Sequence, residues 1–275
     1  YMKSNIKVFL LIFSMLGLFA CNKSEDLVSD GAKEGGLVSA TGSVPYKLGA
    51  TPKVDIKLSI PLGPGVVSIK VYNKYFAESI GKESDKVLMT TVSIGSVNAS
   101  AATDKMLSIV YTDLIKDILV DGVALPTDET LLPIGDYWEL YYVSVLEDGR
   151  EVLNNSTTKI AVANIYAGYY QCEGTFVHPT AGARPIDEQK FLTPLSAYSC
   201  RVNAGDLGAF GYNVVITVDP ATNLVSFSGG APVDMFANTD SVSRYDPATG
   251  MFHLFYFYVG AGGNRVMDEH YTPLP

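Results

Sequence analysis

The feature that most constrains this chain is an alternation of apolar and polar residues, with a period of two, that recurs from Leu37 onward. Residues 53–60 (KVDIKLSI) and 66–72 (VVSIKVY) show it clearly, and the Pro/Gly-rich segment between them suits a turn. This alternation is typical of strands that bury one face. The only helical signal is one short turn that Thr112 or Asp113 would cap. The sequence therefore predicts an all-β protein.

Residues 37–163 hold the first group of predicted strands. Two further strands are expected at 86–94 and 105–111, and residues 135–154 form a clear hairpin whose turn is Asp148-Gly149. About seven short strands with turns between them are typical of an immunoglobulin-like or fibronectin-like β-sandwich. The stretch PIGDYW, which enters the hairpin, also resembles the fibronectin pattern at its sixth strand.

Residues 164–275 form a second group of strands. Strands are expected at 168–179 and 191–203, followed by hairpins at 214–228 and 243–259. Both hairpins contain Asp-Pro-Ala-Thr followed by Asn223 or Gly250, which are residues that tolerate a positive φ. Turn chemistry explains each position of this repeat, so we interpret it as a turn and not as a binding site. An antiparallel meander of six to eight strands is expected, either closed into a small barrel or packed as a second sandwich.

The N-terminus is typical of a targeting segment. Lys3 and Lys7 give a basic start, and residues 8–20 form an apolar stretch shorter than the roughly 20 residues that a membrane-spanning helix needs. The stretch ends in Leu-Phe-Ala-Cys21, which resembles the lipobox of bacterial lipoproteins, with Phe19 as the one departure. The resemblance implies cleavage after residue 20 and lipidation of Cys21. The alternative is an ordinary secretory signal followed by an unrelated cysteine.

The residues after Cys21 refine the expected location. Residues 22–26 (NKSED) resemble the short acidic signals that send Bacteroidetes lipoproteins to the outer face of the outer membrane. A charged segment over 21–36 is also suited to a flexible tether. We expect an outer-membrane protein anchored by lipid and exposed at the cell surface, and attachment facing the periplasm is the alternative.

The whole chain resembles a family. A lipobox, an immunoglobulin-like domain and a second domain that opens AGYYQCEGTF and contains RYDPATGMFHLFYFY are similar to two-domain surface lipoproteins of Bacteroidetes. These proteins are found in glycan-uptake loci of the starch-utilisation type. The resemblance implies a calycin-like β-barrel as the second domain and an outer-membrane transport complex as a partner.

Composition and motifs exclude several functions. Apolar residues make up 47% of the chain, enough to fill cores, while the net charge of −9 argues against nucleic acid as a partner. The histidines, His178, His253 and His270, are too far apart along the chain for a compact metal motif, and His253 is expected to be packed or half exposed. No HExxH, CxxC, GxSxG or P-loop motif occurs. The sequence predicts no metal and no cofactor.

The acids give no sign of catalysis. Asp136 and Glu139 flank Trp138, and Asp187 and Glu188 are adjacent, but nothing in the sequence pairs carboxylates across strands as glycoside hydrolysis requires. We therefore expect a protein that is not an enzyme.

Cys172 and Cys200 fall in predicted strands of the second domain. In an exported protein such a pair is consistent with a disulfide. Two buried thiols that behave as small apolar residues are the alternative, and the sequence leaves both open.

Aromatic strands supply the candidate ligand-binding residues. Alternation places Trp138, Leu140 and Tyr142 in the core. It leaves Tyr137, Glu139 and Tyr141 on the other face, where tyrosine rings and a carboxylate could stack on and hydrogen-bond to sugars.

Residues 252–258 form a strand with apolar or aromatic residues on both faces. Such a strand is covered on both sides, lines a pocket or meets a partner, and Tyr256 and Tyr258 are its candidate ligand contacts. A non-catalytic surface protein that binds a glycan or a small ligand is the function we expect. A structural or adhesive component is the first alternative, and an enzyme is the second.

Overall fold

The computed structural model describes residues 36–51, 53–61, 65–94 and 102–275. The predicted signal peptide (1–20), Cys21 and nearly all of the tether (21–36) lie outside the described residues. The described residues are all-β, with 60% in strands and 6% in helix, as the alternation predicted. Among the described residues, no helix has both the length and the apolar character needed to cross a membrane.

Two hydrophobic cores divide the described chain into a sandwich unit (residues 36–163) and a barrel unit (residues 168–275). The elements of the sandwich unit are β1 (Ser39–Ala40), β2 (Ser43–Lys47), β3 (Val54–Ile60), β4 (Val66–Ala77), η1 (Glu78–Ile80), β5 (Lys82–Glu83), β6 (Val87–Ser93), β7 (Thr103–Ile109), α3 (Tyr111–Ile115), β8 (Leu119–Val120), β9 (Val123–Ala124), η2 (Glu129–Leu131), β10 (Tyr137–Leu146) and β11 (Glu151–Ala163).

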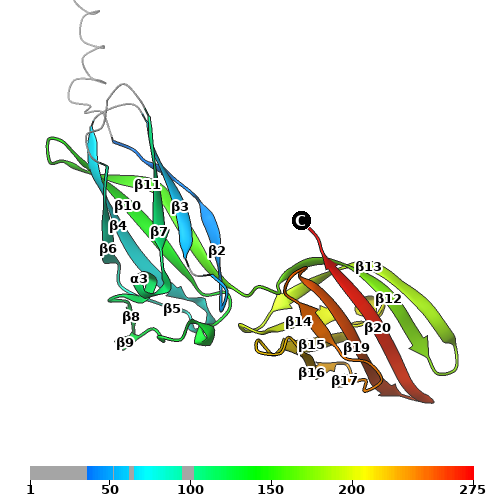
Figure 1. The fold of residues 1–275 in the computed structure, drawn as a ribbon. Helices are drawn as coiled ribbons and strands as arrows, with labels where there is room; N and C mark the ends of the chain where they lie inside the picture. The colour runs from blue at the N-terminus through cyan, green and yellow to red at the C-terminus, as the bar shows by residue number, and fades with distance from the viewer. Residues whose placement is uncertain (1–35, 52, 62–64, 95–101) are drawn as a thin grey trace, which may run out of the picture.

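The sandwich unit consists of two main sheets (Figure 1). One has the order β1-β3-β7, and the other has the order β2-β11-β10-β4, with β5 and β6 both pairing with β4. All of these pairs are antiparallel except β2 with β11, which run parallel over five residue pairs. This arrangement agrees with the predicted immunoglobulin-like sandwich.

Trp138 lies at the centre of the sandwich core. It is fully buried, as are Leu140 and Tyr142 on the same face of β10, so the predicted inward face of this strand is confirmed. The Trp138 ring packs against Tyr75 at 5.1 Å and against Tyr46 at 5.9 Å between ring centroids. Tilted and edge-to-face pairs of this kind are favourable arrangements for aromatic rings.

The barrel unit is one nine-stranded antiparallel sheet with the order β16-β15-β14-β13-β12-β20-β19-β17, and β18 also pairs with β19. Its elements are β12 (Gly168–His178), β13 (Gly182–Pro194), β14 (Ser199–Asn203), η3 (Gly208–Phe210), β15 (Asn213–Val218), β16 (Val225–Ala231), β17 (Phe236–Ala237), β18 (Arg244–Asp246), β19 (Met251–Gly260) and β20 (Gly263–Pro273).

The two ends of this sheet meet to form a nearly closed barrel. Leu224, just before β16, forms an isolated bridge with Arg244 of β18. The Val225 N–H donates to the Ser243 carbonyl at 3.0 Å, and the Tyr245 N–H donates to the Asn223 carbonyl at 2.9 Å. Of the two architectures predicted for this region, the structure has the barrel.

The turn interpretation of the repeated tetrapeptide agrees with the structure. Asn223 has φ 60° and Gly250 has φ 73°, and their N–H groups donate to the carbonyls of Asp219 and Asp246. The single strand predicted at 191–203 was wrong, because the chain turns at 195–198 between β13 and β14. Pro194, the last residue of β13, ends that strand because proline lacks the N–H that a ladder requires.

A short link joins the two units, and Asn164 fixes its start. Its side-chain amide donates to the Ser196 carbonyl at 2.8 Å, and its side-chain oxygen accepts the Ala167 N–H at 2.8 Å. Ala197 and Tyr198, from the turn between β13 and β14, pack against the sandwich core. The link is therefore held to the barrel unit by hydrogen bonds.

Candidate functional site

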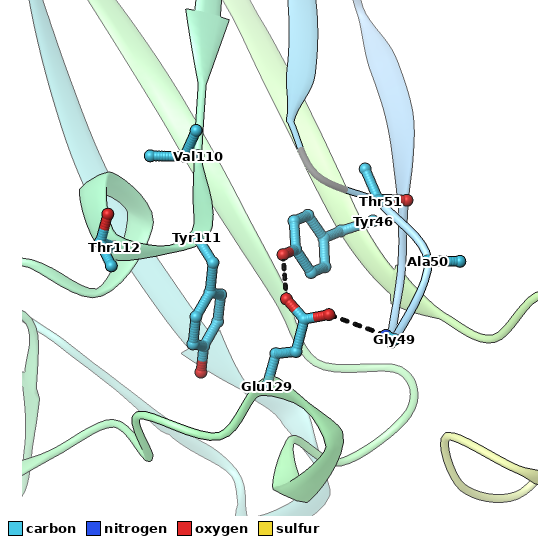
Figure 2. A pocket seen from close by; sticks show the side chains of 8 residues that line it. All are labelled: Tyr46, Gly49, Ala50, Thr51, Val110, Tyr111, Thr112 and Glu129. Atoms are coloured by element: carbon cyan, nitrogen blue, oxygen red, sulfur yellow. Dashed lines mark hydrogen bonds between the residues drawn. The ribbon is translucent and has the colours of Figure 1, made fainter. Parts of the chain in front are cut away.

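A pocket of about 430 Å³ lies at the end of the sandwich where β2 stops and α3 begins (Figure 2). It is formed by β2 and the turn after it, by the start of α3, and by η2. The lining residues are Tyr46, Gly49, Ala50, Thr51, Val110, Tyr111, Thr112 and Glu129. Loops at the end of a rigid sandwich are a common place for binding residues.

Glu129, the first residue of η2, supplies the carboxylate of this pocket. Its Oε1 accepts the Gly49 N–H at 2.8 Å, and its Oε2 accepts the hydroxyl of Tyr46 (Figure 2). Gly49 has φ 73°, a left-handed conformation in which a larger side chain would be strained. The tight turn after β2 thereby directs a backbone N–H at the carboxylate.

Burial and hydrogen bonds hold the two tyrosines of the pocket in place. Tyr46 is fully buried, and Tyr111 is half-buried and donates its hydroxyl to the Pro126 carbonyl at 2.6 Å. Burial, followed by the charge of Glu129, raises the pKa of Tyr111 to about 12. Burial and the hydrogen bond to Glu129 raise the pKa of Tyr46 well above its ordinary value. Both phenols are therefore neutral at physiological pH and keep their hydroxyl protons.

The Glu129 carboxylate keeps capacity for a ligand. Each carboxylate oxygen has two lone pairs, so one donor per oxygen leaves further acceptor positions. Among the described residues, no lysine or arginine forms a salt bridge with Glu129. Thr51 and Thr112 add hydroxyl groups to the wall. A carboxylate, aromatic rings and hydroxyls form a combination that suits a hydroxyl-rich ligand.

A second pocket, of about 370 Å³, lies at the same end of the sandwich and contains Asp136. Asp136 is buried, and it accepts the Tyr75 hydroxyl at 2.8 Å and the Ser79 N–H at 3.0 Å. The other lining residues are mostly apolar, among them Val120, Leu125 and Leu132. This pocket therefore offers a ligand a mainly apolar surface, because its one buried acid is already hydrogen-bonded to Tyr75 and Ser79.

The tyrosine face predicted on β10 exists, but its rings already have partners. Tyr137, Glu139 and Tyr141 are half-buried, and the Tyr141 hydroxyl donates to Glu139 at 2.5 Å. Phe76 stacks on Tyr137 at 4.7 Å, and Lys159, from the strand on the other side, lies 3.8 Å from the same ring centroid. A sugar would have to displace these groups before it could stack on Tyr137.

Tyr256 and Tyr258, the other predicted ligand contacts, are buried in the barrel core. The Tyr256 hydroxyl donates to Glu269 at 2.8 Å and accepts the Gly205 N–H at 3.2 Å. Glu269 also accepts a hydrogen bond from the buried Lys190 ammonium at 2.5 Å. Side chains therefore fill the barrel at this level, and Tyr256 is committed to an internal network.

Cys172 and Cys200 are both buried and both free thiols. Burial raises the pKa of Cys200 to about 11, and burial together with the charge of Glu269 raises that of Cys172 to about 12. Thiols with such high pKa values are poor nucleophiles. Of the two alternatives that the sequence left open, the structure has the reduced one.

The structure brings together two of the three histidines. His253 on β19 and His270 on β20 are register partners, and their rings stack at 4.4 Å between centroids. Separation along the chain was therefore a poor guide, because pairing of adjacent strands makes distant residues neighbours. The predicted half exposure of His253 agrees with a side chain that is 27% exposed.

Sequence reasoning missed the pocket around Glu129. Tyr46 and Glu129 are 83 residues apart, and no motif links them. The only local signals were the Tyr46–Gly49 turn and the Asp-Glu-Thr stretch of η2, in which Asp128 accepts the Thr130 N–H at 3.0 Å. Neither signal shows which distant residue it contacts, so the site could be recognised only in the folded structure.

Part of the chain matches a protein-family model. Residues 154–272 match a family model for a C-terminal domain, whose description reads "-like, C-terminal". The family is of a Bacteroidetes type, which agrees with the phylum expected from the sequence. The matched segment runs from β11 through most of β20, so it corresponds to the barrel unit with the last strand of the sandwich.

Comparison with curated proteins gives no match. Among solved structures, the sporulation control protein Spo0M from Bacillus subtilis is similar over 76% of this chain and 80% of its own, at 9% identity. The TM-score is 0.30. A similarity this low supports no conclusion about the fold or the function of this chain.

Proposed function

We propose that this protein is a non-catalytic lipoprotein of the outer-membrane surface that binds a glycan through the pocket around Glu129. The observation that carries this proposal is the Glu129 carboxylate, held by two neutral donors, the Tyr46 hydroxyl and the Gly49 N–H, beside the half-buried ring of Tyr111. Sugars present hydroxyl donors and an apolar ring face, and these match a carboxylate acceptor next to an aromatic ring. The pocket volume is suited to one or two sugar units, such as those at the end of a polysaccharide.

Affinity should be modest. The pocket is open, and the ligand loses hydration and conformational freedom on binding, so a dissociation constant between about 1 mM and 1 μM is expected. Isothermal titration against a panel of host and dietary oligosaccharides would find the ligand. Glu129→Gln should weaken binding about tenfold or more, because hydrogen bonds to a charged acceptor contribute about 1.5–3 kcal/mol.

Matched variants locate the site. Glu147→Gln changes an exposed acid in the hairpin at the other end of the sandwich and should leave binding unchanged. Tyr141→Ala tests the tyrosine face of β10, and Tyr258→Phe tests the barrel. If Tyr141→Ala abolishes binding while Glu129→Gln does not, the pocket assignment is wrong. If no glycan binds the parent protein, glycan capture itself is wrong.

The anchor has its own test. Cys21→Ala should abolish incorporation of labelled palmitate and release the protein from the outer-membrane fraction, because the acyl chains provide the attachment. Protease added to intact cells should digest the parent protein if it faces outward. A mutant that is still labelled would refute lipidation at Cys21. In this proposal an outer-membrane transport complex receives the glycan, so genes for such a complex and for glycoside hydrolases should lie nearby.

A structural or adhesive role is the second candidate, and exposed apolar side chains at the pocket end of the sandwich favour it. Ile80 is 65% exposed, Val123 is 69% exposed and Leu131 is 68% exposed. Side chains of this kind on neighbouring loops are suited to contact with another protein. An Ile80→Ser/Leu131→Ser variant that still binds glycan but no longer recovers a partner from outer-membrane extracts would show that both roles are present.

A further inference from the structure

The outer face of the barrel brings three metal-ligating side chains together. His253 lies on β19, and Asp268 and His270 lie on the adjacent β20. His253 and His270 are register partners, and Asp268 precedes His270 by two residues, so all three side chains lie on one face of the sheet. One ligand atom from each residue lies within 4.8 Å of the others.

The two imidazoles are directed at the same carboxylate oxygen. The Nε2 of His253 lies 2.7 Å from Oδ1 of Asp268, and the Nε2 of His270 lies 3.7 Å from that atom. The rings are nearly parallel, with an interplanar angle of 4°. A hydrogen bond between His253 and Asp268 explains the 2.7 Å distance. It gives no reason for the second ring, that of His270, to direct its Nε2 at the same oxygen.

The kinds of ligand atom at this cluster determine which metal ions it suits. Imidazole nitrogen with one carboxylate oxygen suits zinc, copper, nickel and iron, whereas calcium and magnesium favour ligands that are all oxygen. Zn–N and Zn–O bonds of about 2.0–2.2 Å require the ligand atoms to approach one another more closely than 4.8 Å. The side chains of Asp268 and His270 are 47% and 56% exposed, so they have room to rotate inward, while His253 is more buried.

Neighbouring strands modify the site from two sides. Arg244 on β18 is the register partner of His253, and its positive charge opposes a cation. Glu173 on β12 is the register partner of His270 on the other side and adds a negative charge on the adjacent strand. The ligands come from paired strands, which hold them more firmly than loops would.

We infer that His253, Asp268 and His270 form a binding site for one divalent transition-metal ion of the zinc class. Two histidines and a carboxylate coordinate the ion, and water completes its coordination. Because the site is shallow and solvent-exposed, its dissociation constant for Zn²⁺ falls in the micromolar range, weaker than in the enclosed structural sites of zinc proteins. The site is independent of the pocket around Glu129, which lies in the other unit.

Zinc titration of the full chain tests this inference. The detergent-solubilised protein, free of any histidine tag and stripped of metal, should bind one Zn²⁺ per chain by isothermal titration. His270→Ala should weaken binding at least tenfold, and Asp268→Asn several-fold. His178→Ala is the matched control and should bind as the parent does, because His178 lies in β12 and accepts the N–H groups of Thr180 and Ala181. The cysteines are unchanged in every variant, so they do not contribute to the differences.

A second measurement separates coordination from a structural role. Co²⁺ bound by two histidines and a carboxylate should give visible absorption bands, and these should disappear in His253→Ala/His270→Ala while the far-UV circular dichroism stays that of the parent. Absence of Zn²⁺ binding up to 1 mM would overturn the inference, as would equal binding by the double variant. A Co²⁺ spectrum unaffected by the double variant would overturn it as well.

Discussion

Each unit of this protein buries a carboxylate, and the two are held in different ways. Asp136 in the sandwich unit is 1% exposed and accepts hydrogen bonds from the Tyr75 hydroxyl and the Ser79 N–H. Glu269 in the barrel unit is fully buried and accepts bonds from the Lys190 ammonium and from two tyrosine hydroxyls. Among the described residues, no cation forms a salt bridge with Asp136.

The difference indicates where ligand chemistry is to be expected. In the barrel unit, the charge of Glu269 is compensated by Lys190 inside a filled core. In the sandwich unit, Glu129 and Asp136 are held by neutral donors and both border pockets. A ligand can therefore reach the remaining acceptor positions of Glu129, whereas Asp136, which is 1% exposed, stays buried behind the lining of its pocket. The four predictions below test this contrast, from the largest expected effect to the smallest.

Lys190→Met should have the largest effect. It leaves Glu269 charged, buried and without its cation, which typically costs about 3–5 kcal/mol of unfolding free energy. Lys190→Met/Glu269→Gln should recover most of this loss, since it removes both charges and keeps an amide oxygen that accepts the Tyr256 and Tyr271 hydroxyls. Urea unfolding measures the effect. Lys82→Met, which breaks an exposed pair with Asp121, should cost less than about 1 kcal/mol. If Lys190→Met and Lys82→Met lowered the unfolding free energy equally, the buried ion pair of the barrel unit would matter no more to stability than an exposed pair of the sandwich unit.

Asp136→Ala should destabilise the sandwich unit by about 1–3 kcal/mol, because the Tyr75 hydroxyl and the Ser79 N–H lose their acceptor in a buried site. Asp136→Asn should cost less, since its amide oxygen still accepts a hydrogen bond and no buried cation is left unpaired. The same urea titration, followed by the fluorescence of Trp138, reports on this unit. Asp85→Ala, at an exposed position, is the control. An Asn variant as damaging as Lys190→Met would mean that the charge of Asp136 is essential to the fold.

Alkaline pH should weaken the barrel unit before the sandwich unit. The pKa of Cys200 is about 11 in the folded protein and about 8.5 in an unfolded chain. The unfolded state therefore loses this proton first. The stabilising contribution is full below about pH 8.5, and it decreases as the pH rises towards 11, by about 2 kcal/mol at pH 10.

The sandwich unit responds later. Its described residues include no cysteine, and Tyr111, with a pKa of about 12, begins to contribute only above about pH 9, where an unfolded tyrosine starts to ionise. Urea unfolding at pH 7, 9 and 10 checks the order. Cys200→Ala should remove about half of the decline between pH 8.5 and 10, because the buried Cys172 thiol, with a pKa of about 12, contributes the rest. A sandwich unit that loses stability first would contradict the prediction.

Tyr141→Phe should have the smallest effect. It removes the hydrogen bond to Glu139 on a half-buried surface, and surface changes of this kind usually alter stability by about 0.5 kcal/mol. Glycan binding should also stay unchanged if the ligand occupies the pocket around Glu129. A loss larger than that of Asp136→Ala would show that the tyrosine face contributes to the sandwich as strongly as its buried acid does.

Local patterns in the sequence predicted the features that local physics determines. The Asp-Pro-Ala-Thr turns follow from proline at the second turn position and from Asn223 or Gly250 at the position with positive φ. The inward face of β10 follows from alternation around Trp138. Neither result requires knowledge of which strands are neighbours.

Features that depend on pairing between distant strands could not be predicted. The residues around Glu129 come from three separate segments, and the His253–His270 pair exists only in one register of β19 with β20. A shift of that register by one residue would separate the two rings, and the sequence of neither strand specifies the register by itself. The partners that cover Tyr137 depend on pairing for the same reason.

The parallel pairing of β2 with β11 affects how the protein responds to force. Ser43 to Lys47 pair with Lys159 to Ala163, and the chain leaves β11 directly into the link to the barrel unit. Tension between an attachment upstream of β2 and a load on the barrel unit pulls the two strands in opposite directions along their length. Such shear loads all the hydrogen bonds of the pair together, whereas unzipping an antiparallel hairpin breaks them one at a time. The β2–β11 pair should therefore resist such pulling more strongly than an antiparallel hairpin of the same length.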